Sequence, residues 1–218
     1  GKWHLDGGHG RMGSAKQCGL TPVRRTHQGR WKKWFGFELR NDPFDTYYFI
    51  DDDPTPRPIE KYQTDGLFDI GIDYIANQWD PSSSFCMCIS VEPPHDPFIA
   101  PDDLQRIWEE KEIKLPPNFA AKDQQKRELF IRSRKRYYAM VENLDQNVGR
   151  MVEFLRCQAL AENTIILFVS DHGELNGSHG LRAKQWPYEE SIGIPLIVCD
   201  PSYSERHGTT VGDPTCTE

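Results

Sequence analysis

The stretch Thr164-Ile165-Ile166-Leu167-Phe168-Val169-Ser170-Asp171-His172-Gly173-Glu174 decides the fold that we predict for this chain. Its first six residues form an apolar, β-branched run, which is typical of a strand covered on both faces. A carboxylate, an imidazole and a glycine follow the run almost at once. Because open parallel sheets bind ligands beyond the carboxyl ends of their strands, these polar residues predict a site at that edge.

Two further apolar runs, residues 85–91 and 194–198, have the same strand-like character. Between the runs at 85–91 and 164–169, residues 123–160 repeat apolar side chains at three- and four-residue spacing, which predicts an amphipathic helix. The apolar positions of this helix are Tyr137, Val141, Leu144, Val148, Met151 and Leu155. Strand, helix and strand in this order predict a right-handed parallel crossover. We therefore expect an α/β fold with a mostly parallel central sheet flanked by helices, in which strands 85–91 and 164–169 are parallel neighbours or near neighbours.

The 218 residues, 37% of them hydrophobic, suit one domain, with a loop-rich part at 1–66 and an α/β core at about 67–218. A net charge of −7 and a pI near 5.5 argue against a general attraction to nucleic acid. The two basic runs, 24–33 and 126–136, are therefore interpreted as solvated faces. The apolar runs are shorter than the roughly 20 residues that a membrane-spanning helix needs, and residues 1–5 do not resemble a signal peptide.

Six scattered cysteines form neither a disulfide framework nor a zinc motif. Cys86 and Cys88 are two apart in the run 85–91, so both side chains should lie on one face of a strand, where we expect them to be buried. The redox compartment stays open.

Polar loops follow two of the predicted strands. The run 85–91 leads into Pro93-Pro94-His95-Asp96-Pro97, where the prolines stiffen the loop that carries His95. After 164–169, Asp171 and His172 could give one oxygen and one nitrogen to a divalent metal, which could then balance the charge of a sulfate or phosphate. An Asp-His pair without further context is more often a turn or a helix cap.

Several separated motifs resemble those of the sulfatase family, in the alkaline-phosphatase superfamily. They are Gly1-Lys2-Trp3-His4-Leu5, Pro94-His95-Asp96-Pro97, Ser170-Asp171-His172-Gly173, Gly177-Ser178-His179-Gly180, and Lys184 followed by Tyr188-Glu189-Glu190-Ser191. Each motif is short, but their common order along the chain makes the resemblance specific.

The resemblance implies a role for each of six residues. Lys2 and Lys184 would bind sulfate oxygens, and His4 would support the nucleophile. His95 would contact the sulfate and protonate the leaving oxygen. Asp171 and His172 would hold a divalent metal, calcium first, with magnesium or manganese as alternatives. We therefore expect His95, Asp171, His172 and Lys184 to converge at one edge of the sheet, with Lys2 and His4 nearby.

The chain also departs from the family pattern. The family's nucleophile, a Cys or Ser modified to formylglycine within Cys/Ser-x-Pro-x-Arg, has no counterpart here. We reject Cys18-Gly19-Leu20-Thr21-Pro22, because its proline is misplaced and it follows the Lys-x-His motif. Asp51-Asp52-Asp53-Pro54 is interpreted as a turn rather than as the family's paired metal-binding aspartates. The chain is therefore expected to be truncated at both ends, to lose its metal and to be inactive by itself.

Three functions stay open at this point. The first is a sulfuric-ester hydrolase acting on a small-molecule or carbohydrate sulfate ester, and the second is a phosphonate or phosphodiester hydrolase of the same superfamily. The third is a catalytically silent anion-binding fragment. The ester, the oligomeric state and the compartment are not determined, although the family resemblance makes secretion or the periplasm an option.

Overall fold

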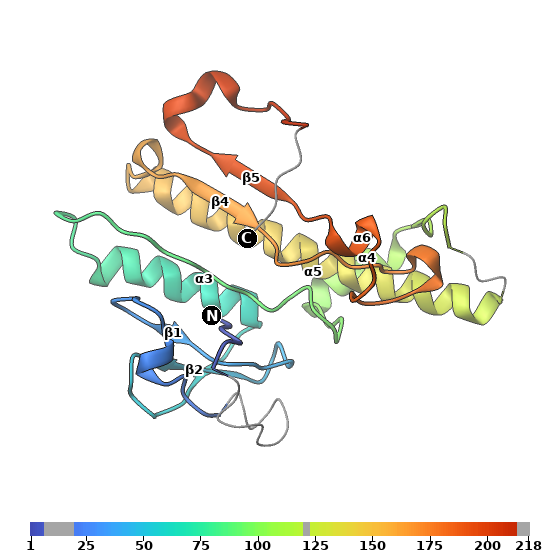
Figure 1. Ribbon diagram of the computed structural model, residues 1–218, viewed down its shortest axis with the longest axis horizontal. Helices are drawn as coiled ribbons and strands as arrows, with labels where there is room; N and C mark the ends of the chain where they lie inside the picture. Colours follow the sequence, from blue (N-terminus) through green and yellow to red (C-terminus); the bar gives the residue numbers. More distant parts are fainter. Residues whose placement is uncertain (7–19, 120–122, 213–218) are drawn as a thin grey trace.

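The long helix α5 (Gln124–Cys157) is the axis of the molecule, and α3 (Gln63–Asp73) and α4 (Asp102–Glu110) pack against it (Figure 1). The structure, a computed structural model, describes residues 1–6, 20–119 and 123–212. The helix predicted at 123–160 is confirmed. Its first turn is capped by the Asp123 carboxylate, which accepts a hydrogen bond from the Gln125 N–H at 3.0 Å.

Residues 20–62 carry a small antiparallel sheet with the order β1 (Phe35–Gly36), β2 (Thr46–Ile50) and β3 (Arg57–Ile59). The predicted turn after β2 is present, and Asp51 adopts a positive φ of 52° there. Lys2 joins this region through a bridge to Phe37, which is fully buried. Phe37 packs with Ile59 and with Leu67 of α3, so the sheet and α3 share one core.

The apolar runs at 164–169 and 194–198 do form strands, β4 (Ile166–Val169) and β5 (Leu196–Cys199), but these two pair antiparallel. Residues 85–91 run extended beside α3 without joining a sheet (Figure 1). The predicted parallel sheet, with 85–91 and 164–169 as neighbours or near neighbours, is therefore not confirmed. A continuous apolar run has no polar alternation to fix its direction or its partner, so the sequence could not distinguish these arrangements. The described fold is mixed α/β, with two small sheets and long helices.

The face of residues 85–91 that carries Cys86 and Cys88 is exposed, which corrects the prediction that both thiols are buried. The opposite face lies on α3, where the side chains of Met87 and Ile89 approach Gly71. The prediction that both thiols lie on one face is confirmed, but only the opposite face of the segment is covered. Cys18 and Cys216 lie outside the described residues.

Short helical turns connect the larger elements. They are η1 (Arg25–His27), η2 (Tyr74–Gln78), η3 (Ala161–Asn163), η4 (Ser178–Gly180), α6 (Glu189–Ile192) and η5 (Pro201–Arg206). Across the described ranges, every helix is too short or too polar to cross a lipid bilayer.

The basic run 24–33 is largely exposed, as interpreted, and the Arg24 side chain is 48% exposed, but one arginine of each basic run also takes part in the fold. Arg24 pairs with the buried Asp6, and Arg134 of α5 donates to the Asn176 carbonyl at 2.8 Å. Their guanidinium groups therefore satisfy oxygen atoms that would otherwise lose hydrogen bonds.

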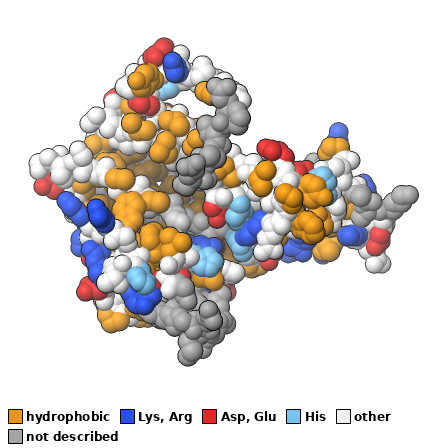
Figure 2. Space-filling model, in the orientation of Figure 1, with side chains coloured by type: hydrophobic (Ala, Val, Ile, Leu, Met, Phe, Trp, Pro, Cys, Tyr) orange, Lys and Arg blue, Asp and Glu red, His pale blue; other side chains and the backbone are white. Residues whose placement is uncertain are grey.

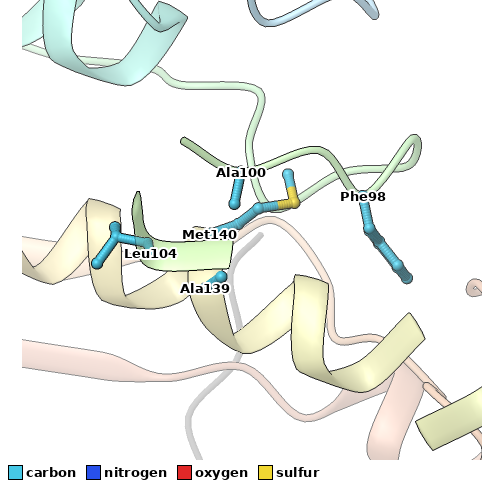
Figure 3. Packing of buried hydrophobic residues seen from close by; sticks show 5 residues of the cluster. All are labelled: Phe98, Ala100, Leu104, Ala139 and Met140. Atoms are coloured by element: carbon cyan, nitrogen blue, oxygen red, sulfur yellow. The ribbon is translucent and has the colours of Figure 1, made fainter. Parts of the chain in front are cut away.

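The core beside α4 is formed by Phe98, Ala100 and Leu104 packing on Ala139 and Met140 of α5 (Figure 3). The buried stripe of α5 is shifted from the predicted apolar face. Val141, which we placed on that face, is 38% exposed. The shift arises because two asparagines take core positions.

These asparagines, Asn143 and Asn147, are 4% and 1% exposed and face α3. Both side-chain amides donate to the same oxygen of Asp65, at 2.8 and 2.6 Å. We call this group the Asp65 clasp. A carboxylate that accepts two buried amide donors offsets the cost of removing three polar groups from water, so the clasp fixes α3 against α5.

Replacing Asp65 with Ala should lower the free energy of unfolding by about 1–3 kcal/mol, because Asn143 and Asn147 lose the carboxylate acceptor that they share, although Asn147 keeps a bond to the Asn143 carbonyl. Urea denaturation of the purified chain followed by circular dichroism would measure the change. Asp73→Ala is the matched control, since Asp73 lies on the same helix but is exposed and, within the described part of the chain, its side chain accepts from the exposed Asn77 and Gln78. The control should change the free energy by less than about 0.5 kcal/mol. An equal loss of unfolding free energy in both variants would show that the Asp65 clasp does not stabilise the fold.

Gly173, just after β4, is pressed against the segment that leads into β5. Its N–H donates to the Ser191 carbonyl at 2.8 Å, and a Cβ placed there would lie 2.3 Å from the Glu190 carbonyl oxygen and 2.8 Å from that of Gly193. These oxygens belong to the backbone of residues 190–193, which cannot move aside cheaply. Only glycine fits this close approach.

Gly173→Ala should therefore destabilise the chain by about 1–3 kcal/mol, because the two backbone segments must separate. Gly149→Ala is the control: Gly149 lies in α5 with open space around it, so alanine should stabilise the helix by about 0.5–1 kcal/mol. Thermal unfolding of the two variants beside the unchanged chain would show shifts of opposite sign. An unchanged melting temperature in Gly173→Ala would show that the space beside Gly173 can accommodate a methyl group.

Candidate anion-binding site

His95 lies in the loop after the extended run 85–91 and is held in one orientation. Its N–H donates to the Glu92 carbonyl at 3.0 Å, and its Nδ1 lies 2.6 Å from the Asp96 carbonyl oxygen. Since a carbonyl only accepts, Nδ1 carries the hydrogen and Nε2 is the nitrogen that can exchange a proton. Burial lowers the pKa of His95, and the nearby charges of Lys184 and Lys2 lower it further.

Lys2 is fixed by a buried partner. Its Nζ lies 3.2 Å from Glu92 Oε1, and the Glu92 side chain is only 4% exposed. Burial raises the pKa of Glu92, while the charge of Lys2 acts in the opposite direction. The Lys2 N–H also donates to the Ser90 carbonyl at 2.9 Å, so both its backbone and its side chain are tied to the segment before His95.

Gln63, the first residue of α3, connects this ion pair to the helices. Gln63 is fully buried; its Oε1 accepts from the Glu92 N–H at 3.1 Å, and its Nε2 lies 3.4 Å from Glu92 Oε2. A small hollow beside the pair is lined by Arg40, Gln63, Glu92, His95, Asp96 and Met140. The site is therefore anchored to α3 on one side and to α5 on the other.

Lys184 comes from a different loop, between β4 and α6. Its charge acts on His95, as described above, and Arg182 Nη2 lies 3.2 Å from Asp96 Oδ1, so the two loops are in contact. Lys2, His95 and Lys184 are therefore brought together from three separate parts of the chain. The wider convergence expected from the sequence, which also includes Asp171 and His172, stays a prediction.

His4 lies on the same extended segment as Lys2 but is exposed. Its N–H donates to the Glu38 carbonyl at 2.9 Å, and its φ of 57° is in the left-handed region. Among the described residues, its imidazole makes no hydrogen bond or ion pair with the other site residues, so its supporting role stays a prediction.

Asp171 and His172 follow β4, as predicted, at the end of that strand. His172 Nδ1 lies 2.7 Å from the Gly173 carbonyl oxygen, which leaves Nε2 as the possible ligand atom, and Nε2 lies 3.6 Å from Asp171 Oδ2. The Asp171 side chain is 86% exposed. Orientation of a histidine through its second nitrogen is usual for metal ligands, so this pair fits a divalent cation as two members of a larger ligand set. Over residues 1–6, 20–119 and 123–212, no three such side chains gather in one place.

The space-filling view shows histidine side chains beside Lys or Arg and Asp or Glu side chains near the middle of one face (Figure 2). Such a mixture of imidazole and opposite charges at a surface can bind an anion and exchange a proton with it. The rejected nucleophile segment begins with Cys18 and Gly19, which lie outside the described residues, as do residues 213–218.

Sequence reasoning assigned no role to Glu92, Gln63 or Arg182. Glu92 carried a signal, because it is a charged residue between an apolar run and the Pro-Pro-His loop, where a solvated charge is not expected. Nothing in the sequence marks Gln63 or Arg182, since their importance depends on contacts between distant segments.

Comparison with known proteins identifies the family. The sequence model described as Sulfatase matches residues 11–210. The ulvan-active sulfatase of Formosa agariphila is 30% identical over 220 residues, which cover 98% of this chain and 40% of that protein. This chain therefore spans about two fifths of that relative's length.

Solved structures agree with this assignment. A Bacteroides fragilis protein assigned to the sulfatases superposes with a TM-score of 0.74 at 27% identity, covering 80% of this chain and 39% of that one. A protein solved in complex with its substrate D-glucosamine-2-N,6-O-disulfate has a TM-score of 0.69 at 19% identity, covering 79% of this chain and 50% of its own, and shows the shared fold. The chain belongs to the sulfatase family.

Proposed function

We propose that this chain forms the anion-binding part of a sulfuric-ester hydrolase that acts on a sulfated carbohydrate. The observation that carries the proposal is that Lys2 and Lys184, from two separate segments, lie close enough to His95 for their charges to act on it. Two ammonium groups beside an imidazole match an ester that carries one negative charge and has a leaving oxygen to be protonated. The carbohydrate class is supported by the relatives, one named for its action on ulvan and one bound to a glucosamine disulfate.

His95 is the proposed proton donor to the leaving oxygen. In the free protein its pKa is lowered, so the imidazole is mostly neutral near pH 7. A sulfate group bound by Lys2 and Lys184 would place negative charge beside the ring and offset the two ammonium charges. The pKa of His95 would then rise, and His95 would become protonated when the substrate is in place.

The metal and the nucleophile complete the proposal. Asp171 and His172 would hold a divalent cation, for which calcium is the first choice and magnesium or manganese are alternatives. When bound, the cation would offset the negative charge of the sulfate. Residues 1–218 contain no Cys/Ser-x-Pro-x-Arg, so the formylglycine nucleophile that we propose would have to come from outside this sequence.

Replacing Lys184 with Met should raise the pKa of His95, because a positive charge that disfavours the imidazolium ion is removed. A histidine NMR titration of the purified chain would measure this. Lys126→Met, which removes an exposed lysine at the start of α5, should leave the His95 titration unchanged. Adding inorganic sulfate to the unchanged chain should also move the His95 pKa upward. A pKa that is insensitive to Lys184 would show that the two loops are not close in solution.

The complete reading frame that encodes this chain should hydrolyse sulfated saccharides, and Lys184→Ala should reduce kcat/KM by about 10²–10³-fold, because one cation that stabilises the developing charge is lost. Turnover would be followed by released sulfate. Lys126→Ala is the control and should retain full activity. The purified 218-residue chain should bind sulfate without turnover.

The same assay with aryl phosphonates and phosphate diesters tests the second candidate. A kcat/KM that is higher on either of those esters than on every sulfate ester would replace the sulfatase proposal with a phosphonate or phosphodiester hydrolase. Absence of turnover on all three classes, with sulfate binding retained, would support the silent anion-binding alternative.

A further inference from the structure

The loop that carries Lys184 has little packing to hold it. Residues 182, 183, 185, 186 and 187 are all exposed, and Trp186 is 50% exposed. On both sides of Lys184 the backbone adopts a positive φ, 62° at Ala183 and 82° at Gln185. Non-glycine residues avoid this conformation, so specific interactions must hold the loop in it.

The interactions at Ala183 come from the segment after β4. The Ala183 N–H donates to Glu174 Oε1 at 2.6 Å, and its carbonyl accepts from the Leu175 N–H at 3.0 Å. Both backbone groups of Ala183 are therefore engaged. Glu174 Oε1 accepts a second bond from the Asn176 N–H at 3.2 Å. One carboxylate oxygen thus joins the two arms of the loop directly before Lys184.

The base of this arrangement is rigid. Leu175 and Asn176 are 1% and 6% exposed, and Arg134 of α5 donates to the Asn176 carbonyl at 2.8 Å. Glu174 also lies near Tyr137 of α5, whose pKa is raised mainly by burial and further by the Glu174 charge. In Figure 1 the segment after β4 runs along α5 toward α6. Glu174 therefore connects the Lys184 loop to α5.

The far end of the loop is held separately. Asn118 donates to Glu190 Oε1 at 2.8 Å, and the His179 ring stacks on Tyr188 with centroids 3.8 Å apart. Neither contact touches residues 182–185. Asp96 holds the Arg182 side chain, and Glu174 is the described side chain that accepts a hydrogen bond from the backbone directly before Lys184.

We propose that Glu174 is a positioning residue: its carboxylate holds the Ala183 backbone so that the Lys184 ammonium group points to the anion beside His95. The inference rests on the proposed function, because Lys184 is taken as a sulfate ligand. Glu174 itself does not touch the substrate. Its effect on activity must therefore pass through Lys184.

Kinetics of the complete reading frame on a sulfated saccharide test this proposal. Glu174→Ala should lower kcat/KM about 10-fold. Glu174→Gln should stay within about twofold of the unchanged enzyme, because the amide oxygen can still accept from the Ala183 N–H. In a Lys184→Ala background, Glu174→Ala should cause no further loss, since nothing remains to be positioned. Glu162→Ala, which removes an exposed carboxylate before β4, is the control and should have no effect.

Two measurements separate this proposal from the proposed function and from simple unfolding. Amide hydrogen exchange should speed up at residues 175–185 in Glu174→Ala but not in Glu162→Ala. The Kd for inorganic sulfate, measured by calorimetry, should rise about 10-fold in Glu174→Ala even if the enzyme shows no turnover. If Glu174→Ala does not fold, Glu174→Asp, which retracts the carboxylate by one methylene, takes its place. The proposal would be overturned if the losses of kcat/KM from Glu174→Ala and Lys184→Ala were additive in the double variant. It would also be overturned if Glu174→Ala raised hydrogen exchange in the loop but left the Kd for sulfate unchanged.

Discussion

The Asp65 clasp is the interaction on which the rest of the structure depends. It joins α3 to α5 through the partly buried Asp65 carboxylate and two buried asparagine amides. Each helix then supports one half of the site: α3 begins at Gln63, which holds Glu92, and α5 carries Arg134, which holds Asn176. Each helix therefore holds one of the segments next to Lys2 and Lys184. Hydrogen bonds suit this task better than apolar contacts, because they fix the register of the helices as well as their separation.

Carboxylates hold both cations of the proposed site, but they do so in different ways. Glu92 pairs directly with the Lys2 ammonium group, and burial makes this pair costly unless it is well satisfied. Glu174 instead acts on the backbone beside Lys184 and leaves that ammonium group without a carboxylate partner in the described interactions. One cation is therefore partly neutralised and the other keeps its full charge. An incoming anion would meet the stronger field on the side of Lys184.

The sequence predicted the local features of this protein well. The spacing of apolar residues located α5 within a few residues of its ends, and the short motifs located His95 and the two lysines whose charges lower its pKa. It failed where the outcome depends on distant partners. Asn143 and Asn147 look like solvent-facing residues until Asp65 is placed opposite them, and the runs at 85–91 and 164–169 do not reveal their pairing. Glu174 could not be recognised because its partner, the Ala183 N–H, is a backbone group that exists in every sequence.

The two-stranded sheet of β4 and β5 has a consequence for the behaviour of the chain in solution. Leu167, Val169, Leu196, Ile197 and Val198 are all about half exposed or more, and apolar side chains are visible over these strands in Figure 2. An open strand edge beside apolar side chains attracts other copies of the same surface. Because hydrophobic attraction weakens on cooling, the isolated chain should be most soluble in the cold and at low concentrations of sulfate or phosphate salts, which strengthen apolar burial. The same sulfate that is the natural probe of the site is thus also a precipitant for this surface, and titrations with it are best kept at low ionic strength.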